Sequence, residues 1–203
     1  MTKETKITLS PKELELVCNR DWILTKHIII DKVYKIFGEL SVSMQERVRQ
    51  ITSTLPREAA EGNPKISRGE NYQGLPYVML DYPRCFGKQE VLAVRTLFWW
   101  GNYFSSTLHV KGPVAKNMVI NVGKKSIISG IATVRISDRG DEWNHTLHSE
   151  NYMSSQEWLL KEATQEGENS FLKLAMQYPL KDWDMAPVFL KQNFEQWMNL
   201  IKK

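Results

Sequence analysis

The segment KISRGENYQGLPY, residues 65–77, holds the densest group of side chains that could bind or react with a ligand. Arg68 offers a planar fork of donors to a carboxylate or phosphate, and Glu70 could hold that fork or act as a base. Asn71 and Tyr72 add neutral hydrogen-bonding groups. The same side chains could instead pair with neighbours and hold an ordered loop, as charged loop residues often do.

A second group is the aromatic run FWWGNYF, residues 98–104. In a strand, Trp99 and Trp100 point to opposite faces of the sheet. Either the sheet is covered on both sides, or one face lines a pocket or a partner site. Arg95 lies just before the run and, with the aromatic rings, could also stack nucleobases, although no nucleic-acid-binding motif accompanies it.

Carboxylates and histidines form a third, dispersed group. Asp81 follows an apolar strand, where it could cap a turn or pair with Glu70 for acid–base work, with His109 as a further titratable group. His145 and His148 are three residues apart, so in a strand they face opposite sides and do not form a shared metal site. The sequence has no HExxH or CxxC motif, and we predict neither a metal nor a cofactor.

Helices are expected to position these groups from both ends of the chain. Ser10-Pro-Lys-Glu13 is a typical helix start, and apolar spacing predicts helices within residues 1–54. We expect a break around residues 19–21, a helix end at Gly38 and a further helix from 43 to about 53. Residues 55–75 contain three glycines and two prolines without a clear period and are expected to form a loop.

The middle of the chain is expected to form the sheet. Expected strands cover residues 75–83, 91–99, 103–111, 127–137 and 143–149, while 112–122 fits either a helix or a strand. The connections are short, which favours antiparallel pairing. Helices are expected again from 156 to 165 and from about 185 to the end, and 171–178 suits a helix or a strand equally.

These elements predict one α+β domain over residues 1–203. A central antiparallel sheet of about five strands would lie in the loop-and-sheet segment 55–150, packed by the helical segments 1–54 and 151–203.

The net charge of +4 is concentrated in one stretch, because residues 91–137 contain no acidic side chain. This stretch could present a positive face to an anionic ligand or weakly to nucleic acid, or it could simply be a sheet whose turns carry lysines. Its basic residues are Arg95, Lys111, Lys116, Lys124, Lys125 and Arg135.

The cysteines and the hydropathy pattern indicate the compartment. Cys18 and Cys85 lack CxxC spacing, which suggests free thiols in a reducing environment rather than a disulfide. The first 20 residues carry charges throughout, and no apolar run is long enough to span a bilayer. We therefore expect a cytoplasmic protein without membrane association.

Three strings together resemble an uncharacterised family of bacterial cytosolic proteins. They are ISRGENYQGLPYVMLDYP (66–83), RTLFWWGNYF (95–104) and TLH (107–109). The resemblance implies a bacterial source and a cytosolic location, and it implies no activity and no site residue.

Three classes of function remain open. The first is a binding module that holds a small anionic ligand or a protein partner through the 65–77 segment and the aromatic strand. The second is an enzyme of unknown class with carboxylate and histidine acid–base groups, and the third is a weak nucleic-acid binder. The candidate ligand-binding residues are Arg68, Glu70, Asn71, Tyr72, Asp81, Arg95, Trp99, Trp100 and His109.

Overall fold

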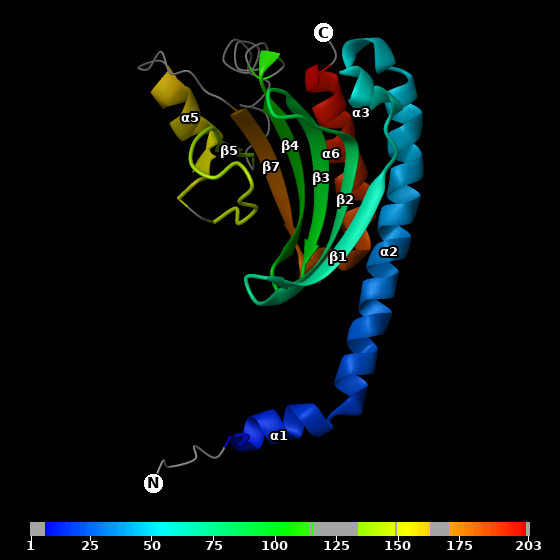
Figure 1. The fold of residues 1–203 in the computed structure, drawn as a ribbon, viewed down its shortest axis with the longest axis vertical. Coiled ribbons are helices and arrows are strands. Elements are labelled where there is room, and N and C mark those ends of the chain that lie inside the picture. Colours follow the sequence, from blue (N-terminus) through cyan, green and yellow to red (C-terminus); the bar gives the residue numbers. More distant parts are fainter. Residues whose placement is uncertain (1–6, 114, 116–133, 149, 163–170, 202–203) are drawn as a thin grey trace.

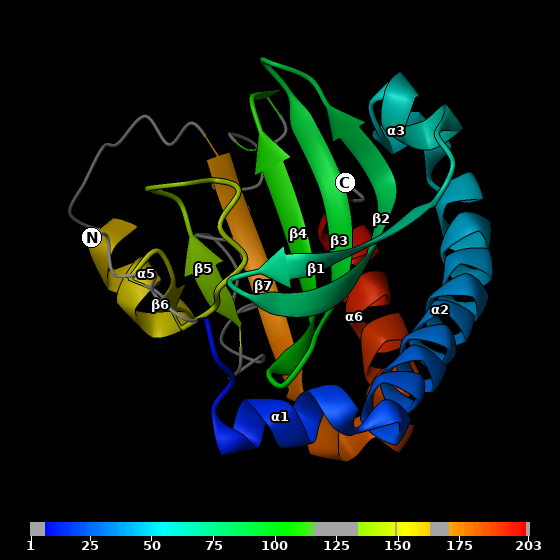
Figure 2. The same ribbon diagram turned by 60° about the horizontal axis from the view of Figure 1, so that its bottom comes forward.

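A computed structural model describes residues 7–113, 115, 134–148, 150–162 and 171–201. The fold is α+β, as expected, with an antiparallel sheet of seven strands rather than about five, in the order β1-β2-β3-β4-β7-β5-β6 (Figures 1 and 2). The strands are β1 (Lys65–Tyr72), β2 (Leu75–Phe86), β3 (Val91–Trp99), β4 (Tyr103–Lys111), β5 (Arg135–Ser137), β6 (Met153–Ser154) and β7 (Phe171–Pro179).

Helices from both ends of the chain pack on one face of this sheet (Figure 1). The long α2 contacts β2, and the C-terminal α6 lies beside α2 and contacts β4. The helices are α1 (Pro11–Cys18), α2 (Arg20–Arg49), α3 (Arg57–Glu61), α5 (Ser155–Glu162) and α6 (Ala186–Ile201), with 3-10 helices η1 (Thr52–Thr54) and η2 (Leu180–Met185).

Helix α2 is continuous through Gly38, so the expected helix end there is wrong, and the two helices expected from this region are one. A buried stripe at three- and four-residue spacing runs along the helix on both sides of Gly38. Packing of this stripe on the sheet outweighs the low helix propensity of one glycine. The stripe consists of Ile30, Val33, Phe37, Leu40, Met44 and Val48.

The two helix starts near the N-terminus form as the sequence indicates. Ser10 makes a complete capping box with Glu13 at the start of α1. The expected break at residues 19–21 is also present, because the Asn19 side chain accepts a hydrogen bond from the Trp22 amide and caps α2.

Strands β3 and β4 have the bounds expected from the sequence and form a hairpin with Trp99 opposite Tyr103. Alternation gives the sheet two different faces. Phe98, Phe104 and Leu108 belong to the helix-covered core, whereas Arg95 and His109 lie on the opposite face. Glu142, Asn144 and His145, from the segment that we call the 138–152 segment, contact this second face, which we call the polar face.

Three expectations for individual segments are corrected by the structure. Part of the expected 55–75 loop is the edge strand β1, whose half-exposed side chains show no regular apolar alternation. Residues 143–148 are turns and irregular chain rather than a strand, although Trp143 and His145 alternate with polar neighbours. The ambiguous segment 171–178 is β7, buried between β4 and β5, so the expected C-terminal helical segment also supplies two strands.

Other expectations concern cysteines, membrane spans and undescribed segments. Cys18 is exposed and Cys85 is buried, and both are free thiols. In the described part of the chain, no helix has the length and apolar character needed to cross a bilayer. Most of the 112–122 segment and of the strand expected at 127–137 lies outside the described residues; only Arg135–Ser137 of that strand is seen, as β5.

Gly38 provides a direct test of helix continuity. A Cβ at this position would meet no atom within 4 Å. We expect Gly38→Ala to raise the free energy of unfolding by about 0.5–1 kcal/mol, because alanine has the higher helix propensity. Urea denaturation of the full chain measures this change.

Gly112→Ala is the matched control. Gly112 has φ +76°, and a Cβ there would lie 2.4 Å from the carbonyl oxygen of Gln89. This variant should lose more than about 1 kcal/mol. A Gly38→Ala variant that is destabilised to a similar degree would contradict a continuous α2.

Candidate functional site

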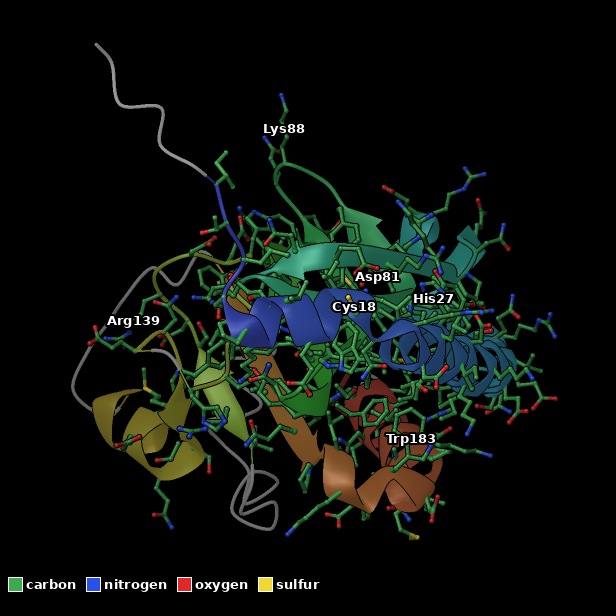
Figure 3. The ribbon with its side chains drawn as sticks, turned by 90° about the horizontal axis from the view of Figure 1, so that it is seen from below. Cys18, His27, Asp81, Lys88, Arg139 and Trp183 are labelled. Carbon is green, nitrogen blue, oxygen red and sulfur yellow. The ribbon has the colours of Figure 1, made fainter. Side chains whose placement is uncertain are left out.

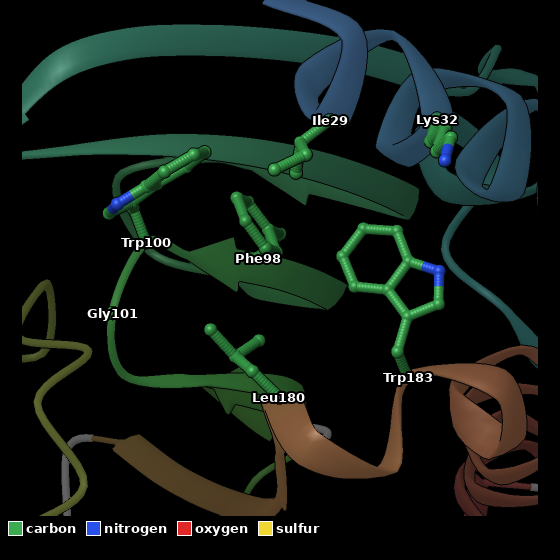
Figure 4. Close-up of a pocket in the computed structure, with 7 residues that line it drawn as sticks. All are labelled: Ile29, Lys32, Phe98, Trp100, Gly101, Leu180 and Trp183. Atoms are coloured by element: carbon green, nitrogen blue, oxygen red, sulfur yellow. The ribbon is translucent and has the colours of Figure 1, made fainter. Parts of the chain in front are cut away.

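An apolar pocket of about 500 Å³ lies at the end of the sheet where β3 turns into β4, between α2 and η2. Figure 4 shows the wall residues reaching in from these three elements. The volume is within the range of ordinary small-molecule sites. The lining residues are Ile29, Lys32, Phe98, Trp100, Gly101, Leu180 and Trp183.

Aromatic contacts fix the shape of this pocket. Phe98 is fully buried and packs edge-to-face on Trp100, with ring centroids 6.2 Å apart, and on Trp183, at 6.0 Å. Trp183 also packs on Phe104, at 5.3 Å. Such contacts restrict the ring orientations, so the walls are formed before any ligand arrives.

Lys32 places one positive charge at the apolar pocket. Its side chain extends from α2 on the same side as Trp183 (Figure 4). This side chain makes no hydrogen bond or ion pair with any residue that the structure describes. A pocket with apolar walls and one unpaired ammonium suits a ligand with an apolar body and a single anionic group.

The polar face of the sheet carries a second cluster, centred on Arg95. Its guanidinium donates two hydrogen bonds to the Asp81 carboxylate, at 2.7 and 2.8 Å, and a third at 2.6 Å to Nε2 of His145. Burial, and then the charges of Lys173 and Arg95, hold the pKa of His145 well below its usual value. A neutral His145 can therefore accept this hydrogen bond.

Lys173 ties the 138–152 segment to β7. It is fully buried, and its ammonium donates to the backbone carbonyls of Glu142, at 3.1 Å, and Asn144, at 2.5 Å. Desolvation, with a smaller contribution from Arg95, lowers the pKa of Lys173 to about 7. Such a shift is common at functional sites, and here the same group also secures a chain segment.

Glu142 brings two further groups to this cluster. Its carboxylate accepts a hydrogen bond from Lys111 at 2.8 Å, and its other oxygen lies 3.3 Å from Nε2 of His109. Burial, followed by the charge of Lys173, lowers the pKa of His109, so the ring is neutral at pH 7. The His109–Glu142 contact is thus a close approach and not an ion pair, and neither facing atom has a hydrogen-bond partner of proper geometry among the described residues.

Tyrosine hydroxyls complete the attachment of the 138–152 segment. The Tyr72 hydroxyl accepts from the His145 amide at 2.9 Å, and the Tyr103 hydroxyl donates to the His145 carbonyl at 3.2 Å. Tyr72 also packs edge-to-face on Trp99, whose indole nitrogen donates to the Tyr72 carbonyl. These contacts give Tyr72 and Trp99 a clear role in holding the segment on the sheet.

The remaining 65–77 residues lie elsewhere. Glu70 pairs with Lys26 of α2, and Arg68 lies 6.0 Å from the Tyr34 ring of the same helix. Arg68 and Glu70 share a small groove of about 300 Å³ with α2. Asn71 accepts a hydrogen bond from the Gly74 amide and shapes the β1–β2 turn.

The candidate residues from the sequence therefore fall into separate places. Five of them are on the polar face, two are against α2, Asn71 is in a turn, and Trp100 lines the apolar pocket. Glu70, Asp81 and His109 do not form one acid–base group. The five residues on the polar face are Tyr72, Asp81, Arg95, Trp99 and His109.

Sequence reasoning missed Lys173, Glu142, Lys32 and Trp183. Lys173 had a detectable signal, because it interrupts the apolar string FLKLAM of a buried strand. Lys32 and Trp183 lie about 150 residues apart in the sequence, so nothing local indicates that they meet at one pocket.

The acid-free stretch does not form a bare positive face in the described part of the chain. Arg95 is paired with Asp81, and Lys111 with Glu142, which leaves Arg135 of β5 as the one described basic residue of the stretch without an ion pair to another described residue. Lys116, Lys124 and Lys125 lie outside the described residues. Among those that are described, no group of three or more histidine, cysteine and acidic side chains could hold a metal ion.

Comparison with known proteins identifies no relative: no protein-family model, curated protein or solved structure matches the chain.

The buried Lys173 makes stability depend on pH. Its pKa is about 7 in the folded protein and about 10.5 in the unfolded chain, so between these values the unfolded chain binds the extra proton. The free energy of unfolding should therefore rise with pH over this range, by at most about 1.4 kcal/mol per pH unit. Urea denaturation at pH 7 and pH 9 would measure the rise in the free energy of unfolding. Both pH values lie below the pKa of free tyrosine, which is about 10.

Lys173→Met serves as the comparison, because it keeps much of the apolar stem and removes the titrating group. From pH 7 to pH 9 the wild-type chain should gain roughly 2 kcal/mol more than this variant. Parallel pH profiles would show that Lys173 is not the group responsible.

Proposed function

We propose that this protein is a binding module for a small amphipathic anion, held in the apolar pocket at the β3–β4 turn. The observation that carries the proposal is the combination of Phe98, Trp100 and Trp183 around a preformed pocket with one unpaired ammonium, Lys32. The apolar body of the ligand would rest between the indole rings, and its anionic group would lie near Lys32.

The polar cluster already has a structural role, which favours the apolar pocket as the ligand site. Asp81, Arg95 and Lys173 are each engaged by neighbours that fix the 138–152 segment. In contrast, Lys32 and the exposed parts of Trp100 and Trp183 have no comparable engagement in the described structure. An enzyme of the expected kind would need Glu70, Asp81 and His109 together, and Glu70 is bound to Lys26 of α2 instead.

A cytoplasmic location in a bacterium remains part of the same proposal. It rests on the resemblance of residues 66–109 and is supported by two free cysteines in the described structure.

Two dyes that share an aromatic body separate the contributions of charge and apolar contact. Anilinonaphthalene sulfonate is anionic, and phenylnaphthylamine is its uncharged counterpart. We expect Lys32→Met to weaken binding of the sulfonate about threefold and to leave the uncharged dye unaffected, since one exposed charge contributes little. Trp183→Ala should weaken both dyes at least about fivefold, because it removes an aromatic anchor.

Matched controls use residues away from the pocket. Lys35→Met removes another exposed lysine of α2, and Trp143→Ala removes an exposed indole beside Phe86. Both should bind the two dyes like the wild-type chain, in titrations followed by dye emission and by calorimetry. Equal losses in Trp143→Ala and Trp183→Ala would place the dye elsewhere and would refute the proposal.

A further inference from the structure

The N-terminal part of the described chain projects beyond the sheet as a two-helix arm, which we define as residues 9–28 and which contacts β1 near its end through the Lys26–Glu70 pair (Figure 1). It comprises α1 and the first turns of α2, marked by Cys18 and His27 in Figure 3. The first buried residue of α2 is Ile30. More than half of the exposed large apolar side chains in the described structure belong to this arm: Leu9, Leu14, Leu16, Val17, Trp22, Ile23, Leu24 and Ile28.

Helix α1 has little to stabilise it among the residues that the structure describes. It has eight residues and none of them is buried. Its capping box satisfies the first turn, but isolated helices shorter than about 12 residues are marginal in water. A further surface that covers its apolar side chains would provide the missing packing.

The charges of the arm indicate what kind of surface this is. Residues 9–28 carry three basic and three acidic side chains, so the net charge is zero. A helix that binds an anionic membrane typically has an excess of lysine and arginine on its polar face, which this arm lacks. A neutral patch can meet an identical patch without net repulsion, as the two-fold symmetry of a homodimer requires.

The exposed area is also sufficient for pairing. The eight side chains are 42–70% exposed, which with usual side-chain areas leaves roughly 700 Å² of apolar surface on each arm. These side chains are spread around both helices, since Leu24 and Ile28 lie about 120–160° around α2 from Trp22. Paired arms would therefore bury part of this apolar area together with the polar side chains beside it. An interface at the lower end of the specific range, about 1,200 Å² in total, is within reach.

We infer that the arm is a dimerisation surface, and that its occupant is the arm of a second copy of this chain. The apolar side chains of α1 and of residues 22–28 pack against their equivalents across a two-fold axis. The residues that line the ligand pocket begin at Ile29, just beyond the arm. This inference does not depend on the proposed ligand.

Sedimentation equilibrium of the full chain at about 100 µM tests the pairing, since an interface of this size associates at that concentration. We expect twice the mass of one chain. The double variant Leu14→Glu and Val17→Glu should have the mass of one chain, because it places like charges in the paired surface. In dilute solution, where both chains are expected to be monomers, its thermal unfolding should match that of the wild-type chain, since neither residue is buried.

Val42→Glu is the matched control, because Val42 is 62% exposed on the same helix α2 but lies outside the arm. It should remain a dimer. A spin label on Cys18, the exposed one of the two thiols, should show a distance between labels in the wild-type chain and none in the double variant.

Two results would overturn the inference: a wild-type chain that is a monomer under these conditions, or a double variant that remains a dimer. A monomeric wild-type chain that also binds phosphatidylglycerol vesicles through Leu14 and Val17 would identify a membrane as the occupant.

Discussion

The packing of α2 on the sheet is the constraint on which the other features depend. Helix α2 has 30 residues, a length of about 45 Å, and its buried stripe begins only at Ile30. Residues 20–29 of the helix therefore contribute no buried side chain to the packing on the sheet. This late start of the stripe leaves Ile29 and Lys32 to line the apolar pocket and leaves the residues before them in the projecting arm.

The two faces of the sheet have different structural roles. Phe98, Phe104 and Leu174 face the helices and form the main core. On the other face, Arg95 and Lys173 hold the 138–152 segment through hydrogen bonds to Asp81, His145 and backbone carbonyls. A stable sheet covered on both sides gives the pocket rigid walls, because β3 contributes Phe98 to the core and ends beside Trp100 at the pocket.

Local patterns in the sequence predicted the elements whose signals are local. The capping box at Ser10, the β3–β4 hairpin and the last helix were all recognisable from short-range spacing. The helix end expected at Gly38 was wrong because tertiary packing overrides the low helix propensity of glycine there. Strand β1 was missed because it pairs as an edge strand and its sequence has no apolar alternation. The candidate site was only partly foreseen, because Lys32 and Trp183 come together through the packing of α2 and η2, which no short motif encodes.

Hydrogen exchange along α2 most directly tests whether the first turns of this helix lie beyond the packed sheet. In dilute solution, where the chain is expected to be monomeric, amides from about residue 33 to 48 should exchange only through global unfolding. Amides of residues 20–28 should exchange much faster, because no buried side chain anchors that part of the helix. Uniform strong protection from residue 20 to residue 48 in dilute solution would contradict a helix α2 that is anchored to the sheet only from Ile30 onwards.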